Sequence, residues 1–344
     1  MTSKYISSFG TMRPPKREVG MSKASTSIPE FHTALLNSKR ILALCGAGLS
    51  AASGLDTFRG KGGMWRNYRA TSLATPEAFE NDPGLVWLFY ALRRHQALNA
   101  KPNMAHFALA ELARQKGEEG FQCLSQNVDG TPPTLLSPPH TNPLGLSQRA
   151  SHPPSQLKLL HSTLFNLKCF NDSCTYLDID NFTDPLCPAL TITPENIETR
   201  LAPAAKSMHN HLDPRRPKAI PEDELPHCPS CETGLLRPGV VWFGEALPSE
   251  TIEGIDEWIE AGESVDLILV IGTTATVWPA SSYVEIARRF GAKVAVVNMD
   301  DGELGSASDL REGDFWFQGD AAVLVPQMLE PVVGDLKQFK ELAA

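Results

Sequence analysis

The stretch LCGAGLSAASGLDTFRG, residues 44–60, decides the fold. It continues the apolar run RILAL (40–44), which breaks directly into Gly46, Ala47 and Gly48. A strand that ends in the pattern G-x-G-x-x-G/A before a helix is typical of nucleotide-binding α/β proteins, because glycine lets backbone amides approach a pyrophosphate. We therefore predict that this turn binds the phosphates of a nucleotide.

Further apolar runs predict buried strands that alternate with helices. Uninterrupted apolar runs are typical of strands in a parallel sheet that is covered on both faces. Helical segments show apolar spacing of three to four residues, a capping residue at the start or a glycine at the end. This alternation indicates an α/β fold with a Rossmann-like, doubly wound parallel sheet. Strands are predicted at 40–44, 121–126, 265–272 and 293–298, and helices from Ile28 with Ser27 as cap and over 279–291.

Long insertions separate these strands. One is helical, because DPGLVWLFYALRRHQAL (82–98) is amphipathic; a second carries paired cysteines; a third, TPPTLLSPPHTNPLG (131–145), is a Pro-rich loop. The predicted organisation is a tail at 1–27, a main domain at about 28–335 whose sheet comes from about 28–60, 105–161 and 238–335, a helical insertion at about 60–104, a cysteine-bearing module at about 162–237 and the loop at 131–145.

The composition excludes several classes of protein. The chain of 344 residues has a formal net charge of −9, so its surface as a whole is not built to bind nucleic acid. No apolar run approaches the roughly 20 residues that span a bilayer, so we expect no membrane association. Seven cysteines, four of them in close pairs, suit a reducing compartment and a metal site better than a disulfide framework. We expect a monomer.

The first 27 residues form a basic tail. They contain five Lys or Arg, one Glu and many Ser and Thr residues. This composition is typical of a mitochondrial transit peptide and equally of a disordered tail, and Met21 is an alternative start. The sequence therefore predicts a mitochondrial location, with a cytoplasmic or nuclear location as the alternative.

The spacing after the glycine turn disfavours a dehydrogenase. A hydride-transferring enzyme should continue into a short βαβ unit with an acidic residue about 20 positions on, which holds the adenosine ribose. Here the chain runs into DTFRGKGG (56–63), and the next predicted strand begins only near residue 121. Hydride transfer therefore remains only a distant alternative.

Polar residues end the predicted strand 121–126 and follow it. Gln126, Asn127 and Asp129 offer amide and carboxylate groups suited to a ribose and a carboxamide, at the sheet edge where such folds bind ligands. His161 is a candidate general base near neutral pH. Each residue alone is equally compatible with a turn, a cap or a structural histidine.

Two cysteine pairs predict a zinc site. Cys169 and Cys174 have four residues between them, and Cys228 and Cys231 have two. Four thiolates suit tetrahedral Zn²⁺ and leave no open coordination position, so the ion should be structural and not catalytic. The alternative is a chance cluster of free thiols. The remaining cysteines, expected to be packed thiols, are Cys45, Cys123 and Cys187.

Together these motifs resemble the sirtuin (Sir2) family of NAD-dependent protein lysine deacylases. The resemblance covers roughly residues 30–330, and although each motif alone is weak, their shared order is specific. The motifs are GAGLSAASGLDTFRG (46–60), QNVD (126–129), the segment around His161, the paired cysteines, VVWFGE (240–245), GTT (272–274) and Asn298.

Within that family the chain is most similar to the class that includes the mitochondrial desuccinylase and demalonylase. Tyr90 and Arg93 match the Y-x-x-R signature of this class. Residues i and i+3 share one face of a helix, and arginine binds a carboxylate through two parallel hydrogen bonds. The resemblance thus implies that this pair binds an acidic acyl group, although an isolated Tyr-x-x-Arg is usually an ordinary helix face. Ala74 matches the small residue that leaves room for a longer acyl chain.

The resemblance implies that NAD is consumed. The acyl-lysine oxygen attacks the ribose carbon that releases nicotinamide, and His161, with Asn127 as the second catalytic residue, promotes attack by a ribose hydroxyl to give O-acyl-ADP-ribose. Phe58 and Arg59 belong to a loop that closes over the cofactor. The residues implied to bind NAD are Gly46, Ala47, Gly48, Ser50, Thr57, Phe58, Arg59, Trp65, Gln126, Asn127, Val128, Asp129, Gly272, Thr273, Thr274, Asn298, Met299, Asp300 and Ala321. Those implied to bind the acyl-lysine protein or peptide are Tyr90, Arg93, Ala74, Val241, Trp242 and Phe243, of which 241–243 would pair with the peptide backbone as an added strand.

The sequence departs from the family pattern at several places. Ser162 follows His161 where the family normally has glycine, Asp56 replaces a usual proline, and LSQRASHP (146–153) after the Pro-rich loop differs from the relatives. The first cysteine pair is also more widely spaced than usual. Three alternatives therefore stay open: a deacetylase, a mono-ADP-ribosyltransferase of the same fold, and an inactive NAD-binding regulator.

Overall fold

The apolar runs of the sequence form the centre of one parallel sheet. The computed structural model describes residues 23–57, 64–65, 68–130, 145–192, 220–300 and 304–343. All the strands of this sheet are parallel to their neighbours, in the order β11-β10-β9-β1-β4-β5. Their bounds are β1 Ile41–Cys45, β4 Phe121–Ser125, β5 Leu157–Leu159, β9 Leu267–Ile271, β10 Lys293–Asn298 and β11 Phe315–Gln318.

The strand order places a ligand-binding edge beside β1. Successive strands β1, β4 and β5 run outward in one direction, whereas β9, β10 and β11 run outward in the other. The order therefore reverses between β1 and β9, and open α/β sheets bind ligands at the carboxyl ends of the strands on both sides of such a reversal. The predicted doubly wound fold is confirmed. The short strand β5 and the outer strand β11 were not predicted.

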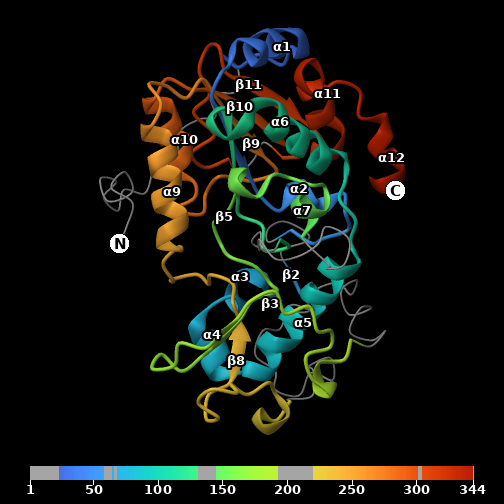
Figure 1. Cartoon of the computed structure of the whole chain (residues 1–344), viewed down its shortest axis with the longest axis vertical. Coiled ribbons are helices and arrows are strands. Elements are labelled where there is room, and N and C mark those ends of the chain that lie inside the picture. The colour runs from blue at the N-terminus through green and yellow to red at the C-terminus, as the bar shows by residue number, and fades with distance from the viewer. Residues whose placement is uncertain are drawn as a thin grey trace.

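Helices cover both faces of the sheet. Alternate residues of each strand point to opposite faces, so Ile41 and Ala43 pack in one core, while Leu42 and Leu44 pack in another. The first face is covered by α1 (Ile28–Asn37), α6 (Met104–Gly120) and α11 (Ala321–Val333), and the second by α9 (Ser249–Glu260) and α10 (Ser282–Arg289) (Figure 1). Ser27 caps α1 as expected, since its side chain accepts from the Glu30 amide.

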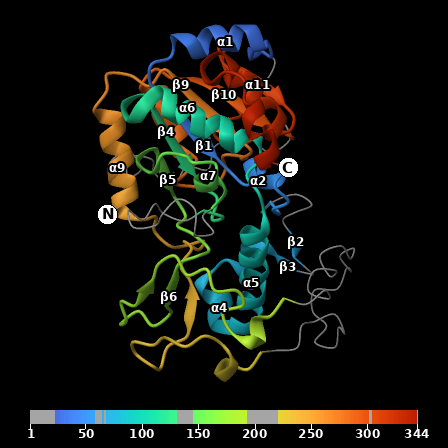
Figure 2. The ribbon, with the colours of Figure 1, turned by 45° about the vertical axis from the view of Figure 1, so that its right-hand side comes forward.

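The insertions build a second, smaller lobe below the sheet (Figure 1 and Figure 2). Its own hydrophobic core joins the helical insertion to the cysteine-bearing module. Buried Arg94 strengthens this junction, because its guanidinium donates to the carbonyls of Leu164, Asn181 and Thr183. The elements of this lobe are β2 Met64–Trp65, β3 Tyr68–Arg69, α3 Ala70–Leu73, α4 Pro76–Asn81, α5 Pro83–Asn99, β6 Leu167–Cys169, β7 Leu177–Asp178 and β8 Leu236–Pro238.

The described residues also form the short α-helices α2 (Gly48–Ala51), α7 (Leu146–Arg149) and α12 (Lys340–Ala343). Among the residues that the structure describes, no helix combines the length and apolar character needed to cross a membrane. Residues 1–22 of the predicted tail (1–27) and residues 131–144 of the predicted Pro-rich loop (131–145) lie outside the described residues.

Candidate active site

A cavity of about 960 Å³ lies where the carboxyl ends of the strands face the smaller lobe. It collects residues from the turns after β1, β4 and β9, from the end of β10, from α5 and from the segment after β8. The sequence-predicted residues that line it are Gly46, Ala47, Gly48, Ser50, Thr57, Ala74, Tyr90, Arg93, Gln126, Asn127, Val128, Asp129, His161, Val241, Trp242, Phe243, Gly272, Thr273, Thr274, Asn298, Met299, Asp300 and Ala321.

The glycine turn packs against the turn after β9. The Gly46 and Gly48 amides donate to the carbonyls of Ile271 and Gly272, over 2.9 and 2.8 Å. A Cβ atom on Gly48 would lie 2.6 Å from the Gly272 Cα, and Gly272 itself has φ +60°. The two glycine amides are thus engaged within the protein. The glycines allow the two backbone segments to approach each other closely. Hydrogen-bond donors to the phosphates of a nucleotide must therefore come from other residues of the cavity.

Behind this turn lies a buried hydrogen-bond network centred on Ser50. The Ser50 hydroxyl donates to Asp129 Oδ2 over 2.6 Å and accepts from Asn127 Nδ2 over 3.2 Å. His106 Nε2 lies 3.4 Å from Ser50 Oγ. The Asn103 amide donates to His106 Nδ1, so the ring proton of the neutral imidazole is on Nε2 and faces the serine. Every donor in this network therefore has a fixed direction.

Burial sets the protonation states of this network. It lowers the pKa of His106 to about 3, so the imidazole is neutral at physiological pH. It also raises the pKa of Asp129, and the hydrogen bond from Ser50 opposes that rise. His106 was not predicted from the sequence. The one signal available was its position three residues after Asn103, where it completes a capping box at the start of α6.

His161 has the geometry of a general base. Its Nδ1 lies 2.8 Å from the Gln126 carbonyl oxygen, and a carbonyl only accepts, so Nδ1 carries the proton and Nε2 has the free lone pair. Burial lowers the pKa of His161, against a smaller opposing effect of the Gln126 carbonyl. The Gln126 side chain is itself held, because its amide donates to Thr273 Oγ1 over 3.0 Å. The imidazole is therefore oriented and neutral near pH 7.

Another part of the cavity lining combines a phenol with a guanidinium. Tyr90 and Arg93 lie one turn apart on α5; Tyr90 is 1% exposed, and Arg93 is half-buried with its guanidinium carbon 4.6 Å from the centre of the Phe89 ring. Burial raises the pKa of Tyr90 far above its ordinary value, despite the nearby Arg93 charge, so the phenol stays protonated. Ala74 lines the same cavity and accepts from the Phe243 amide. This part of the cavity can donate hydrogen bonds and positive charge to a ligand.

The segment after β8 is held by its own backbone amides. The Val241 amide donates to the His161 carbonyl over 3.0 Å, and the Phe243 amide donates to the Ala74 carbonyl over 2.9 Å. The Trp242 amide donates to the Glu245 carboxylate over 2.7 Å. A peptide strand that pairs with residues 241–243 would therefore use their carbonyl groups and not these amides.

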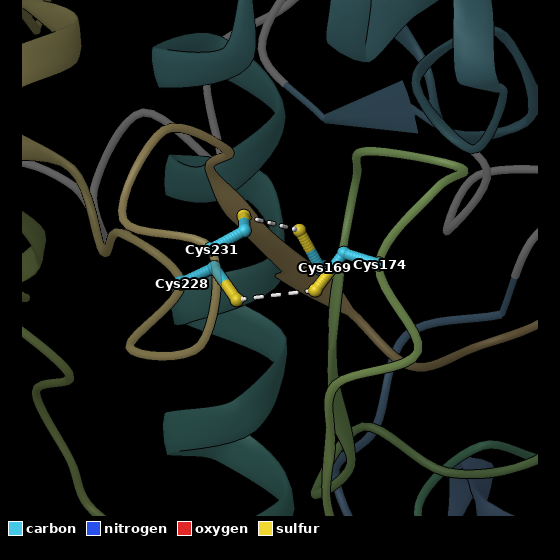
Figure 3. Close-up of side chains that lie close together, drawn as sticks. All are labelled: Cys169, Cys174, Cys228 and Cys231. Carbon is cyan, nitrogen blue, oxygen red and sulfur yellow. Dashed lines mark hydrogen bonds between the residues drawn. The ribbon is translucent and has the colours of Figure 1, made fainter.

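The four paired cysteines form one cluster in the smaller lobe. Figure 3 shows the four side chains pointing toward one another, and their sulfur atoms all lie within 4.8 Å of each other. The Cys169–Cys231 and Cys174–Cys228 sulfur distances are 3.6 and 3.8 Å. A tetrahedral zinc with Zn–S bonds of about 2.3 Å separates its sulfurs by roughly 3.8 Å. The cluster therefore fits a structural zinc ion, and the wider spacing of the first pair does not prevent it.

Comparison with known proteins identifies the family. A model of the Sir2 family matches residues 46–133 and 145–279. The chain belongs to the Sir2 family. A Candida albicans NAD-dependent protein deacylase is 46% identical over 322 residues, which cover 90% of this chain and 99% of that protein. The mitochondrial NAD-dependent protein deacylase sirtuin-5 of Danio rerio is 35% identical, with 92% and 90% covered. A solved Sir2 homologue in complex with NAD is 30% identical, with a TM-score of 0.65 and with 91% of this chain and 98% of that chain covered.

This Sir2 protein is therefore an NAD-dependent protein deacylase, with NAD as its co-substrate. Some residues implied to bind NAD are not in the cavity lining. Trp65 is 6% exposed and packs edge-on against Phe89, 5.6 Å between ring centroids, within the core of the smaller lobe. Phe58 and Arg59 lie outside the described residues.

Other residues line the cavity of this Sir2 protein without having been predicted. Gln96 lies one turn after Arg93 on α5, so extending the i, i+3 face of the Tyr90–Arg93 signature by one turn could have found it. Leu164, Leu247 and Trp278 also contribute to the lining. They belong to segments between regular elements, for which the sequence offers no periodic signal.

Ser162 carries backbone strain beside His161, the candidate general base of this Sir2 protein. Its φ is +59°, a left-handed conformation that costs a non-glycine residue about 1 kcal/mol or more. We expect Ser162→Gly to raise the free energy of unfolding by about 1 kcal/mol and to keep turnover, because the Gln126 carbonyl and not residue 162 orients His161. Thermal unfolding and a deacylation assay test this.

Ser151 provides a matched control for that substitution. It also has positive φ, +61°, but unlike Ser162 it is not next in sequence to a residue that lines the cavity. Ser151→Gly should stabilise the protein to a similar degree. A loss of turnover in Ser162→Gly alone would show that the serine side chain contributes to the site.

Proposed function

We propose that this deacylase removes acidic acyl groups, namely succinyl, malonyl and glutaryl, from lysine side chains of proteins. The observation that carries the proposal is that Tyr90 and Arg93 line the same cavity as His161. A lysine whose acyl carbonyl lies near the base would then extend its acyl chain toward the phenol and the guanidinium. The small side chain of Ala74 leaves space on that path.

The chemistry of this part of the cavity favours a carboxylate over a methyl group. Taking a guanidinium out of water is costly unless an anion or hydrogen-bond acceptors compensate. Arginine can bind a carboxylate through two parallel hydrogen bonds, and the protonated phenol of Tyr90 adds a donor. An acetyl group ends in a methyl and can use neither. The pair therefore supports selectivity for acyl chains that end in a carboxylate.

The remaining residues receive the following roles in this proposal. NAD, when bound, supplies the ribose carbon from which nicotinamide leaves. Asn127 and Asp129, fixed through Ser50, orient the nicotinamide and its ribose, and His161 Nε2 takes the proton of a ribose hydroxyl. Gly272, Thr273, Thr274, Asn298, Met299 and Asp300 contact the adenosine half, and Gly46, Ala47, Gly48 and Ser50 lie against the phosphates.

An acyl panel tests the proposed function. Purified protein with NAD and one lysine peptide carrying succinyl, malonyl, glutaryl or acetyl should release nicotinamide fastest with the acidic groups. The ratio of succinyl to acetyl kcat/KM is expected to exceed about tenfold, the value of one charged hydrogen bond. Preference for acetyl would overturn the proposal in favour of a deacetylase. Transfer of adenylate label to protein would instead indicate ADP-ribosylation, and NAD-dependent thermal stabilisation without turnover an inactive regulator.

We also propose a mitochondrial location. The basic tail of residues 1–27 supports it, as do the names of relatives such as the mitochondrial sirtuin-5 proteins of dog and zebrafish. Fractionation of cells that express the full chain tests this, and recovery of the protein in the cytosol or nucleus alone would contradict it.

A further inference from the structure

The hydroxyl of Tyr90 has a partner that fixes the direction of its proton. Trp242 Nε1 donates to Tyr90 Oη over 3.0 Å, and the two side chains are only 2% and 1% exposed. An indole N–H donates and never accepts. The phenol oxygen therefore serves as an acceptor toward Trp242, and its own proton must find an acceptor elsewhere. Within the described part of the chain the structure contains no acceptor for that proton.

We propose that Trp242 is a positioning residue for acyl-group selectivity, because its indole N–H holds the phenol of Tyr90 as a hydrogen-bond donor toward the cavity. The inference rests on the proposed function and adds to it a requirement on the substrate. The acyl group must carry a hydrogen-bond acceptor at the end of its chain, even before its charge is considered. Because the indole N–H of Trp242 is bonded to Tyr90 Oη, it acts on the acyl group through Tyr90.

The indole is itself held in place by a buried ion pair. The Arg237 guanidinium lies over the Trp242 ring, 3.2 Å from its centre, and is 3% exposed. Glu245 accepts two hydrogen bonds from this guanidinium, over 2.6 and 3.0 Å, and a third from the Trp242 amide. The indole can therefore neither rotate nor shift without losing its contact with this guanidinium. A cation on the ring face also draws electron density from the indole, which strengthens its N–H as a donor.

The protonation states of Glu245 and Tyr90 do not change near neutral pH. Burial alone would raise the pKa of Glu245, but the hydrogen bonds from Arg237 and from the Trp242 amide lower it overall, so the carboxylate stays ionised. Burial raises the pKa of Tyr90 despite the Arg93 charge nearby. Lys168 also faces Glu245, at 3.6 Å. The phenol thus remains a neutral donor wherever the enzyme is folded and active.

The arrangement separates two kinds of acyl group. A succinyl chain brings a carboxylate that accepts the Tyr90 proton. A butyryl chain has the same length but ends in a methyl, so the buried hydroxyl proton stays without an acceptor. A succinamyl chain, whose end is a neutral amide, brings an acceptor without the charge. Acceptance of this neutral end group distinguishes a fixed phenol donor from attraction by Arg93 alone.

The test compares Trp242→Phe with wild type, using the full-length enzyme, NAD and the same peptide carrying succinyl or acetyl lysine. Loss of the indole N–H should lower the succinyl-to-acetyl ratio of kcat/KM about tenfold, mainly through a higher KM for the succinyl peptide. Tyr90→Phe should lower this ratio to a similar degree. The double variant should lower it no further, because both changes remove the same oriented phenol donor.

Trp87 offers a matched control. It is equally buried in the smaller lobe, donates its indole N–H to the Leu236 carbonyl over 2.8 Å and does not line the cavity. Trp87→Phe should lower the melting temperature and leave the ratio unchanged. If Trp242→Phe also leaves the ratio unchanged, or if the losses in the two single variants add in the double variant, the positioning role is wrong.

A second measurement needs no tryptophan variant and so stands if Trp242→Phe fails to fold. Wild-type enzyme should process succinamyl-lysine about tenfold faster than butyryl-lysine, and Tyr90→Phe should abolish this difference. Equal rates for the two acyl groups in wild type would overturn the inference. The wild-type ratio of succinyl to acetyl reports separately on the proposed function, so the two failures are distinguishable.

Discussion

Replacing His161 by asparagine should lower kcat/KM by at least about 100-fold, the usual contribution of a positioned general base. Asparagine can still donate to the Gln126 carbonyl, which holds Nδ1 at 2.8 Å in wild type, so the local backbone should be preserved. What is lost is the lone pair of Nε2. Deacylation with succinyl and acetyl peptides should fall alike, because the base acts on the ribose and not on the acyl end.

The pH dependence of wild type provides an independent check. The base must be neutral, and burial lowers the pKa of His161 below its ordinary value of 6.5. Activity should therefore fall only as the pH drops through this lowered pKa, and the acidic limb should lie below the pKa of an ordinary histidine. The profile of kcat/KM for an acetyl peptide, whose acyl group does not titrate, measures this. The residual activity of His161→Asn should lack that acidic limb.

His32 supplies the control for His161. It lies on α1, far from the cavity, and its ring binds the Gln327 carbonyl. His32→Asn should keep both the rate and the pH profile. NAD-dependent thermal stabilisation should persist in His161→Asn. If the variant retains most of its activity, or if its acidic limb is unchanged, another group is the base.

The sequence predicted those strands in which burial alone determines the pattern of apolar residues. Strands β1 and β9 are buried on both faces and appear as uninterrupted apolar runs, and β10 is apolar between its two ends. Strand β4 is equally buried but includes Gln122 and Ser125, so its apolar pattern is weaker. Strand β5 has only three residues, two of them half-exposed, which is too short for any periodic signal. Its position at the sheet edge is set by tertiary pairing with β4.

The candidate site was predictable where it is local in sequence and unpredictable where it depends on contacts between distant segments. Helical spacing joined Tyr90 to Arg93, and four thiols in two pairs indicated one metal site. The bond between Trp242 and Tyr90 joins residues 152 positions apart, and no motif encodes it. The glycine turn is the instructive case, since its motif predicted free amides, whereas the amides of Gly46 and Gly48 are bonded to the turn after β9.

Arg93→Met should lower the succinyl-to-acetyl ratio of kcat/KM about 30-fold, which corresponds to the roughly 2 kcal/mol of a partly buried charged hydrogen bond. Methionine keeps the apolar contact with the Phe89 ring, over which the guanidinium lies, but removes the charge and both donors. The loss should appear mainly in the KM of the succinyl peptide, because the interaction binds the acyl group and not the reacting carbon. Steady-state nicotinamide release with both peptides measures it.

Two further variants determine whether Arg93 contributes to the succinyl-to-acetyl ratio through its charge or through its paired hydrogen-bond donors. Arg93→Lys keeps the charge but not the paired donors, and should recover only part of the ratio. Arg69→Met makes the same substitution at an exposed arginine on β3 outside the cavity, and should change nothing. Full recovery by lysine would mean that the acyl end is recognised by charge alone, which would leave the fixed phenol of Tyr90 without a role. An unchanged ratio in Arg93→Met would remove the basis for selectivity toward acidic acyl groups, because the remaining donors of that part of the cavity are neutral.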